Sequence, residues 1–256
     1  MMQRRDKLAN CITSCVRNTA VDIDLVVLPE LCTLDYCEAS FSALAEIAEE
    51  EQGDTFAFFS RLAKTLAIAI SFSIATRDHC RYYISNLVVD SHGELISRYN
   101  KVHLAQLGAC HERDHFASGH AFGAFELDGY QFGVLLCYDF RFPNYVQTLC
   151  QKFDVDVLLH PVAFFKDETY ATWHRFAIAR AVENQVYFLS VNRAGDQWGQ
   201  TILCPPWVDV TSEPTVMGEE ESSEVIRLSK VQIEQVRTKY PILHDQHSDY
   251  TKLDAP

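Results

Sequence analysis

Three short apolar runs, each ending at a polar or reactive side chain, constrain this chain more than any other feature. The run at 24–29 is followed by Glu30, the run that begins at 95 is followed by Lys101, and the run at 133–137 ends in Cys137. Short apolar runs of this kind predict buried strands. A lone charge at a strand end is most often solvated, so each run alone says little about function.

The rest of the chain alternates between helical and extended patterns. Leu8, Ile12 and Val16 recur at helical spacing and predict a first helix over residues 3–18. The other predicted helices lie at 38–50, 55–67 (capped by Asp54 or Thr55), 144–152 and 170–184, and the predicted strands at 68–75, 82–90, 95–99, 155–160 and 187–192. A hairpin is predicted around the Asp128-Gly129 turn, between 121–127 and 131–137. Such alternation predicts an α/β or mixed α+β fold.

Length and charge limit the classes of protein to consider. The 256 residues contain no linker, repeat or low-complexity tract, so we expect one domain over 1–256. A formal charge of -13 without a basic cluster argues against a nucleic-acid partner.

Cysteine usage and hydropathy predict the compartment. Nine cysteines without regular spacing indicate reduced thiols rather than a disulfide framework. The first residues lack the apolar stretch of a secretory signal, and no window approaches the roughly 18 apolar residues of a membrane span. We therefore expect a cytoplasmic protein without a membrane segment.

Four motifs carry a resemblance to a known family. They are Leu-Pro-Glu-Leu at 28–31, Asn-Lys-Val-His-Leu at 100–104, Cys-Tyr-Asp-Phe-Arg-Phe-Pro at 137–143 and Ala-Arg-Ala-Val-Glu-Asn-Gln at 179–185. With these motifs the chain resembles the carbon-nitrogen hydrolase (nitrilase) superfamily from about residue 6 to the Asp-Tyr at 249 and 250. The resemblance implies a four-layer αββα sandwich and pairing through a helical face, hence a homodimer or higher homo-oligomer.

The chain departs from this family at its start. Relatives usually begin with a strand ahead of the first helix, whereas this sequence opens directly at the helix. An unfilled strand position exposes apolar surface and unpaired backbone groups. We therefore expect low stability or unusual oligomerisation.

The resemblance also implies roles for the three strand-end residues. Glu30 is expected to take the thiol proton of Cys137, and Lys101 to stabilise the oxyanion together with the backbone N–H of Tyr138. Glu112 lies in a Glu-Arg-x-x-Phe-x-x-Gly segment that in family amidases places a second glutamate against the catalytic lysine. The alternative for Glu112 is a loop carboxylate paired with a surface cation such as Arg113.

Other residues near these motifs are candidates for binding. Arg141 could hold a substrate carboxylate or form an ion pair that supports its turn. Phe164, Trp173 and His174 fall where relatives shape the pocket wall, but they may equally be core residues. The densest cluster of metal-ligand types is Cys110, His111, His115 and His120. Its loop-like composition makes a ligand-bearing helix doubtful, so we expect neither a metal nor another cofactor.

Several activities remain open at this stage. Tyr-Asp-Phe-Arg-Phe-Pro follows the cysteine as in amidases, so we favour hydrolysis of a small linear amide to a carboxylate and ammonia through a thioester. An N-carbamoyl amidohydrolase or an omega-amidase is the alternative within the superfamily, and a catalytically silent binding or scaffold member is the rival outside catalysis. A cysteine hydrolase with His160 or His174 as its base is also open. The segment at 199–207 lacks the family's usual turn glycine, which indicates a rebuilt loop near the pocket.

Overall fold

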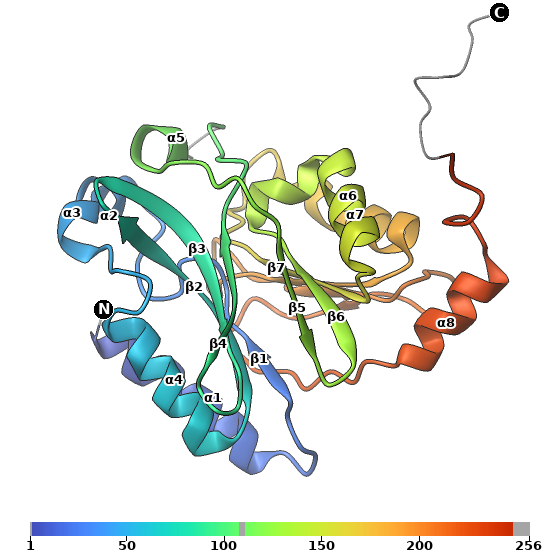
Figure 1. Cartoon of the computed structure of the whole chain (residues 1–256), viewed down its shortest axis with the longest axis horizontal. Coiled ribbons are helices and arrows are strands. Elements are labelled where there is room, and N and C mark those ends of the chain that lie inside the picture. Colours follow the sequence, from blue (N-terminus) through green and yellow to red (C-terminus); the bar gives the residue numbers. More distant parts are fainter. Residues whose placement is uncertain (1, 108–110, 248–256) are drawn as a thin grey trace, which may run out of the picture.

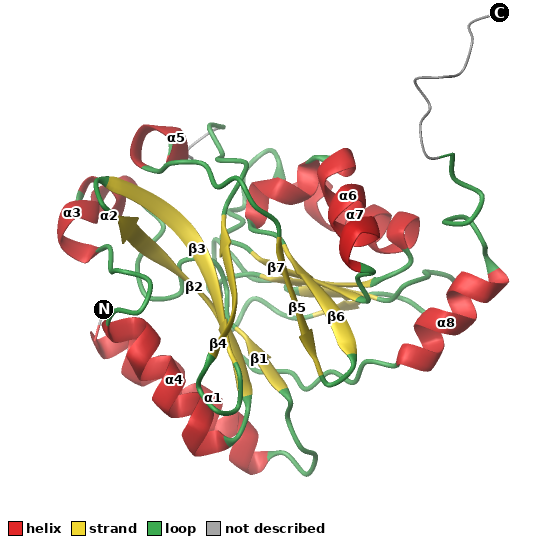
Figure 2. Cartoon of the chain, viewed as in Figure 1, coloured by secondary structure: helices red, strands yellow, loops and turns green. Residues whose placement is uncertain are grey.

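Two β-sheets pack face to face, and each carries helices on its outer face, so the molecule has four layers (Figure 1). The computed structural model describes residues 2–107 and 111–247. Colouring by secondary structure makes the order of the layers visible: helices, sheet, sheet, helices (Figure 2). The predicted αββα sandwich is confirmed.

The first sheet has the order β1-β2-β3-β4. Its strands are β1 (Leu25–Val27), β2 (Ala69–Asp78), β3 (Arg81–Val89) and β4 (Leu95–Asn100). β1 runs parallel to β2, while β2, β3 and β4 are antiparallel to one another. Glu30 follows β1 and Lys101 follows β4, as the apolar runs predicted.

The second sheet has the order β10-β9-β8-β7-β6-β5. Its strands are β5 (Gly123–Leu127), β6 (Tyr130–Val134), β7 (Val157–Pro161), β8 (Tyr187–Val191), β9 (Ile202–Cys204) and β10 (Thr215–Val216). β6, β7 and β8 are parallel. β5 and β6 form the predicted hairpin, and Asp128 and Gly129 both have positive φ, as a two-residue type I′ turn requires.

Helices cover both outer faces. α1 (Met2–Asn18) and α4 (Asp54–Leu66) pack on the first sheet, and α6 (Pro143–Phe153) and α7 (Tyr170–Asn184) pack on the second. The remaining helical segments are α2 (Glu38–Ser42), α3 (Leu44–Ile47), α5 (Glu112–His115), the 3-10 turn η1 (Cys137–Arg141) and α8 (Lys230–Lys239). Within the described ranges, none of the helices has the length and apolar character that crossing a membrane needs.

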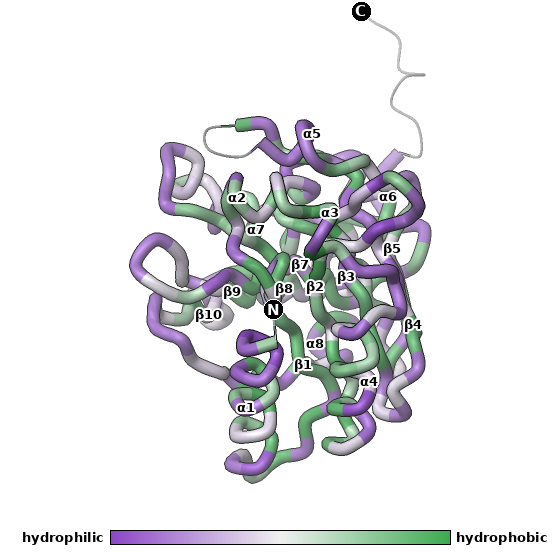
Figure 3. Tube along the Cα trace, turned by 90° about the vertical axis from the view of Figure 1, so that its left-hand side faces the viewer, coloured by the Kyte–Doolittle hydropathy of each residue, from purple (hydrophilic) through white to green (hydrophobic). Residues whose placement is uncertain are grey.

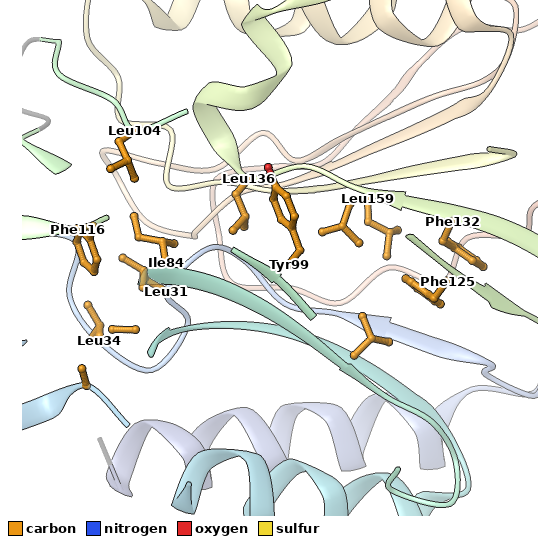
Figure 4. Close-up of a cluster of buried hydrophobic side chains, with 14 of the residues drawn as sticks. Leu31, Leu34, Ile84, Tyr99, Leu104, Phe116, Phe125, Phe132, Leu136 and Leu159 are labelled. Carbon is orange, nitrogen blue, oxygen red and sulfur yellow. The ribbon is translucent and has the colours of Figure 1, made fainter. Parts of the chain in front are cut away.

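The largest buried cluster fills the space between the two sheets. Ile84 and Tyr99 reach into it from the first sheet, and Phe132 and Leu159 from the second (Figure 4). Leu31, directly after Glu30, is fully buried in the same cluster. Coloured by hydropathy, the strands are mostly apolar and the outer loops mostly hydrophilic (Figure 3). The core therefore fixes the ends of both sheets on the side where the candidate residues lie.

The helix predicted at 38–50 is wrong in its extent. It is divided into α2 and α3, and Glu49 instead pairs with β2: its N–H donates to Ala75 O (3.2 Å), and Arg77 N–H donates to its carbonyl (2.7 Å). The predicted cap of α4 is also wrong, because the N-cap is Gly53 and makes no side-chain bond. The carboxylate of Glu49 accepts from both the N–H and the hydroxyl of Thr55 at 2.6 Å, which replaces the cap.

Within the described residues α1 is the first element, and β1 pairs only with β2 at the edge of its sheet. Leu28 N–H donates to Ser71 O, and Ala69 N–H donates to Asp24 O, so even-numbered residues of β1 face β2. The amides of Leu25 and Val27 then face away, at the outer edge of the sheet. The effect of this edge on stability and association stays a prediction.

Candidate active site

Lys101 lies between two carboxylates. Its Nζ donates to Glu30 Oε1 at 2.8 Å and to Glu112 Oε1 at 2.7 Å, and all three side chains are fully buried. Residues 71 and 11 positions apart in the sequence are thus in direct contact. Glu112 therefore pairs with Lys101, as the family resemblance implied, and not with Arg113.

Each carboxylate is held by a second set of donors. Glu30 Oε2 accepts from Ala163 N–H at 3.1 Å. Glu112 Oε2 accepts from Ala105 N–H at 2.7 Å, and its Oε1 also accepts from the hydroxyl of Tyr36 at 2.6 Å. Charge-assisted bonds of this kind fix both carboxylates and, through them, the ammonium.

Gly119 allows the loop after Glu112 to approach Lys101. Its N–H donates to Lys101 O at 2.8 Å. A Cβ at this position would lie 2.1 Å from Asn100 O, so any larger residue would push the loop away. Close contact with Asn100 therefore explains why the last position of the Glu-Arg-x-x-Phe-x-x-Gly motif is a glycine here.

Burial and charge shift the pKa values in this cluster. Burial, together with the neighbouring Glu112, raises the pKa of Glu30 to about 7 against the lowering influence of Lys101. Burial alone would lower the pKa of Lys101, but Glu112, Glu30 and Cys137 outweigh it and raise that pKa well above its ordinary value. Lys101 is therefore protonated at neutral pH, whereas Glu30 titrates near neutrality.

Cys137 sits in a strained turn that follows β6. It opens η1 with φ +40°, in the left-handed region that residues other than glycine rarely adopt. Its thiolate is one of the charges that raise the pKa of Lys101, which places the sulfur within electrostatic reach of the ammonium. The N–H of Tyr138 belongs to the first turn of η1, where amides have no acceptor within the helix.

Asp139 ties this turn to the segment that carries Lys101. It is fully buried and accepts from Leu136 N–H (2.9 Å), Tyr99 OH (2.6 Å), and both the backbone N–H (2.9 Å) and the ring Nδ1 (2.8 Å) of His103. Sequence reasoning gave Asp139 no role, and no local pattern reveals a network that joins residues up to 40 positions apart.

The two histidines considered as bases both donate to backbone carbonyls. His160 Nε2 lies 2.8 Å from Cys137 O, and His174 Nε2 lies 2.8 Å from Gln200 O. A carbonyl only accepts, so each Nε2 carries a proton. Burial lowers the pKa of His160 to about 3 and also lowers that of His174. This geometry disfavours a histidine base and makes His160 a support for the backbone of the cysteine.

Arg141 and the predicted pocket residues lie behind this turn. The guanidinium of Arg141 packs 5.5–5.6 Å from the rings of Phe140, Phe164 and Phe176, and its Nη2 is buried without a hydrogen-bond partner. Its Nη1 lies 3.5 Å from Thr172 Oγ1, and within the described ranges no carboxylate lies within 4.0 Å of Arg141 to form the turn-supporting ion pair. Trp173 is fully buried, stacks on Phe164 at 5.1 Å and donates to Ser190, which is typical of a core residue.

The histidine-rich cluster does not converge on one point. His115 contacts Glu38 (2.9 Å) and His111 lies 3.8 Å from Asp114. Glu112–His115 does form one helical turn, contrary to the sequence prediction, while Cys110 lies outside the described residues. Among the residues whose positions are described, no three His, Cys, Asp or Glu side chains form a potential metal site.

Comparison with known proteins agrees with this geometry. The chain matches the carbon-nitrogen hydrolase family over residues 2–238. It is 31% identical over 232 residues to a 2-oxoglutaramate amidase from Bacillus subtilis (strain 168), covering 88% of this chain and 86% of that protein. An omega-amidase from Homo sapiens is 27% identical and covers 88% of this chain and 83% of its own length.

Solved structures show the same architecture. A Saccharomyces cerevisiae member of branch 10 of the nitrilase superfamily superposes with a TM-score of 0.83 at 26% identity, covering 98% of this chain and 91% of that one. A carbon-nitrogen hydrolase superfamily protein from Xanthomonas campestris, solved with an arsenic adduct in its active site, superposes with a TM-score of 0.81 at 25% identity and covers 97% and 92%. The fold, the family match and the relative at 31% identity together show that this chain belongs to the carbon-nitrogen hydrolase family.

Proposed function

We propose that this protein hydrolyses a small linear amide to a carboxylate and ammonia, with Cys137 as nucleophile. The observation that carries the proposal is the buried ammonium of Lys101 held between Glu30 and Glu112 beside the strained cysteine. Strained backbone conformations cluster at functional sites, and a buried carboxylate with a pKa near neutrality suits proton transfer in both directions.

Acylation begins when the sulfur of Cys137 attacks the amide carbon and its proton passes to the carboxylate of Glu30. The carbonyl oxygen becomes an oxyanion that accepts hydrogen bonds from Lys101 Nζ and the N–H of Tyr138. As the tetrahedral intermediate collapses, the C–N bond breaks, Glu30 returns the proton to nitrogen, and ammonia leaves. The product of this half-reaction is a thioester.

Deacylation uses the same groups with water as the nucleophile. Glu30 takes a proton from water as its oxygen attacks the thioester carbon, and Lys101 again stabilises the oxyanion. Collapse breaks the C–S bond, the sulfur regains its proton from Glu30, and the carboxylic acid ionises on release. Glu112 keeps the ammonium of Lys101 in place throughout.

The substrate class that we favour is the ω-amide of a dicarboxylate. The relatives described above are named for amides that carry a carboxylate at the far end, and Arg141 has a buried donor, Nη2, without a partner. A guanidinium pairs well with a carboxylate in two-pronged geometry. Phe164 packs against the Arg141 guanidinium, and the ring of His174 lies 4.6 Å from that of Trp173, so both remain candidate wall residues, whereas the full burial of Trp173 favours a supporting role.

The cellular compartment, the domain organisation and the assembly of the enzyme are also part of the proposal. None of the eight described cysteines forms a disulfide, which fits a reducing, cytoplasmic compartment. We keep the sequence-based expectations of one domain over 1–256 and of a homodimer or higher homo-oligomer. Gel filtration with light scattering measures the assembly.

The test is an ammonia-release screen over ω-amides of dicarboxylates, simple aliphatic amides and N-carbamoyl compounds. We expect the best turnover on an ω-amide, and loss of all turnover in Cys137→Ala. Arg141→Met should raise KM for the carboxylate-bearing amide at least tenfold, the scale of one lost charge-assisted bond, and leave a simple amide unchanged. An active alanine variant would show that the nucleophile is misplaced. No ammonia from any compound, with no cysteine preferentially modified by iodoacetamide, would favour a binding or scaffold protein.

A further inference from the structure

Arg193 binds the backbone of the turn that carries Glu30. It follows β8, and its Nη1 donates to Glu30 O and Leu31 O at 3.1 Å each, while Nη2 donates to Leu34 O at 2.7 Å. Leu31 has φ +48°, so the chain leaves Glu30 through a left-handed residue. Three carbonyls that converge there share one planar guanidinium, which matches the fixed fork of arginine donors.

Asn192 holds the backbone segment whose N–H donates to the Glu30 carboxylate. Its Oδ1 accepts from Phe164 N–H at 2.8 Å, and its Nδ2 donates to Phe164 O at 3.0 Å. The neighbouring residue, Ala163, supplies the N–H that reaches Glu30 Oε2 at 3.1 Å. The adjacent residues Arg193 and Asn192 thus fix the main chain of Glu30 and the backbone segment that binds its side chain, respectively.

Arg193 is not explained by an ion pair. Across the residues that the structure describes, no carboxylate lies within 4.0 Å of its guanidinium, whose other close contact is the ring of Trp198 at 5.6 Å. Burial lowers the pKa of Arg193 from its ordinary value. A partly buried cation that donates to carbonyls costs desolvation free energy, and the nearby charges of Asp35 and Glu30 offset it only in part. All three guanidinium hydrogen bonds of Arg193 go to the turn that carries Glu30.

We propose that Arg193, with Asn192, is a positioning residue that holds Glu30 in register with Lys101 and Cys137. The inference rests on the proposed function only in taking Glu30 as the proton-transfer group, and it holds for any amide substrate. A displacement of about 1 Å at a catalytic group lowers turnover roughly 100-fold. The positive charge of Arg193 near the carboxylate also favours its ionised form.

The experiment compares Arg193→Ala and Arg193→Lys with Arg237→Ala. Arg237 is the control, since its Nη2 also donates to a backbone carbonyl, Val155 O at 2.8 Å, while its Nη1 pairs with Asp156 at 3.4 Å and makes no contact with the described site residues. For Arg193→Ala we expect kcat to fall about 100-fold with little change in KM, and the acid limb of the pH profile to move to higher pH. Arg193→Lys keeps the positive charge but not the forked arrangement of donors, so its kcat should fall less than that of Arg193→Ala. Arg237→Ala should keep its kcat and its pH profile.

Guanidinium ion supplies a further readout. At concentrations that leave the native enzyme unaffected, it should restore part of the kcat of Arg193→Ala and none in Arg193→Lys. The proposal is overturned if folded Arg193 variants keep the native kcat and pH profile, or if Arg237→Ala loses as much kcat as Arg193→Ala. Should Arg193→Ala fail to fold, Arg193→Lys carries the same comparison.

Alkylation separates this proposal from the proposed function. The pH dependence of iodoacetamide modification at Cys137 reports on the proton acceptor without any amide substrate. If the native protein hydrolyses no ω-amide but its Cys137 alkylation profile shifts in Arg193→Ala, the substrate assignment fails and the positioning role stands. An unshifted alkylation profile in both Arg193 variants refutes the positioning role regardless of substrate.

Discussion

Replacing Glu112 with glutamine tests the electrostatics of the site most directly. The change removes one of two negative charges beside Lys101 and keeps an oxygen that can accept from Ala105 N–H. Because Glu112 raises the pKa of Glu30, its neutral replacement should lower that pKa from the value of about 7. The acid limb of kcat/KM should then move to lower pH, since Glu30 would be ionised at more acidic pH.

The size of the shift follows from the geometry. The two carboxylate oxygens lie 2.8 and 2.7 Å from the same Lys101 nitrogen, so they are at most about 5.5 Å apart. At that separation and an effective dielectric constant of about 20, their repulsion is about 3 kcal/mol. This corresponds to a downward shift of about two pH units. Loss of the second anchor on Lys101 should at the same time lower kcat by about 10- to 100-fold.

The assay is the pH dependence of ammonia release, with alkylation of Cys137 as a substrate-free second readout. Glu126→Gln is the matched control, because Glu126 is exposed on β5 and contacts only Gln131 among the described side chains. Its profile should superimpose on the native one. An acid limb in Glu112→Gln that stays within half a pH unit of native would refute the two-carboxylate account, because the charges would then be screened from each other.

The remaining predictions concern stability. Glu30 has a folded pKa of about 7 against an ordinary 4.5, so the folded state binds more protons between these values and its stability falls as pH rises through that window. Urea titrations should therefore show Glu30→Gln gaining stability relative to native from pH 4.5 to 7, and a constant difference would contradict the raised pKa. Asp139→Asn removes the charge and replaces one of the two oxygens that together accept from four donors, so it should cost about 2–4 kcal/mol in the same titrations; a loss under about 0.5 kcal/mol would mean that the network relaxes freely. In hydrogen exchange, Leu25 and Val27 amides should exchange faster than Leu28, and equal protection would show that another segment covers the β1 edge.

The sequence predicted the reactive residues better than the residues that hold them. Glu30, Lys101 and Cys137 were proposed because each lies at the end of an apolar run and within a motif that resembles the family, and both signals are local in the chain. Arg193 follows the apolar strand β8 in the same way, but its partners are backbone carbonyls 159 to 163 residues away, and carbonyls leave no mark on sequence pattern. Trp173 was considered for the pocket wall because of its family position, whereas the structure buries it fully.

Tertiary pairing explains where the element predictions failed. Residues 38–50 carry a helical pattern, but Glu49 gains two backbone bonds to β2 and a carboxylate contact to Thr55 by leaving the helix. A local pattern cannot anticipate this exchange, because β2 begins 20 residues later. Helix α7 instead has the predicted bounds of 170–184, since it packs against β8 and β9, the two strands that follow it in the chain.

The turn at Cys137 shows how the fold maintains a strained nucleophile. A non-glycine residue at φ +40° costs about 1–3 kcal/mol, which neighbouring bonds from His160 and Asp139 must offset. Glycine ordinarily destabilises a protein relative to alanine, but at positive φ the order should reverse. We therefore expect Cys137→Gly to be more stable than Cys137→Ala by about 1 kcal/mol in urea titrations, with both variants inactive. If alanine is the more stable of the two, the backbone at this position is relaxed, and the strain cannot be part of how the sulfur is presented.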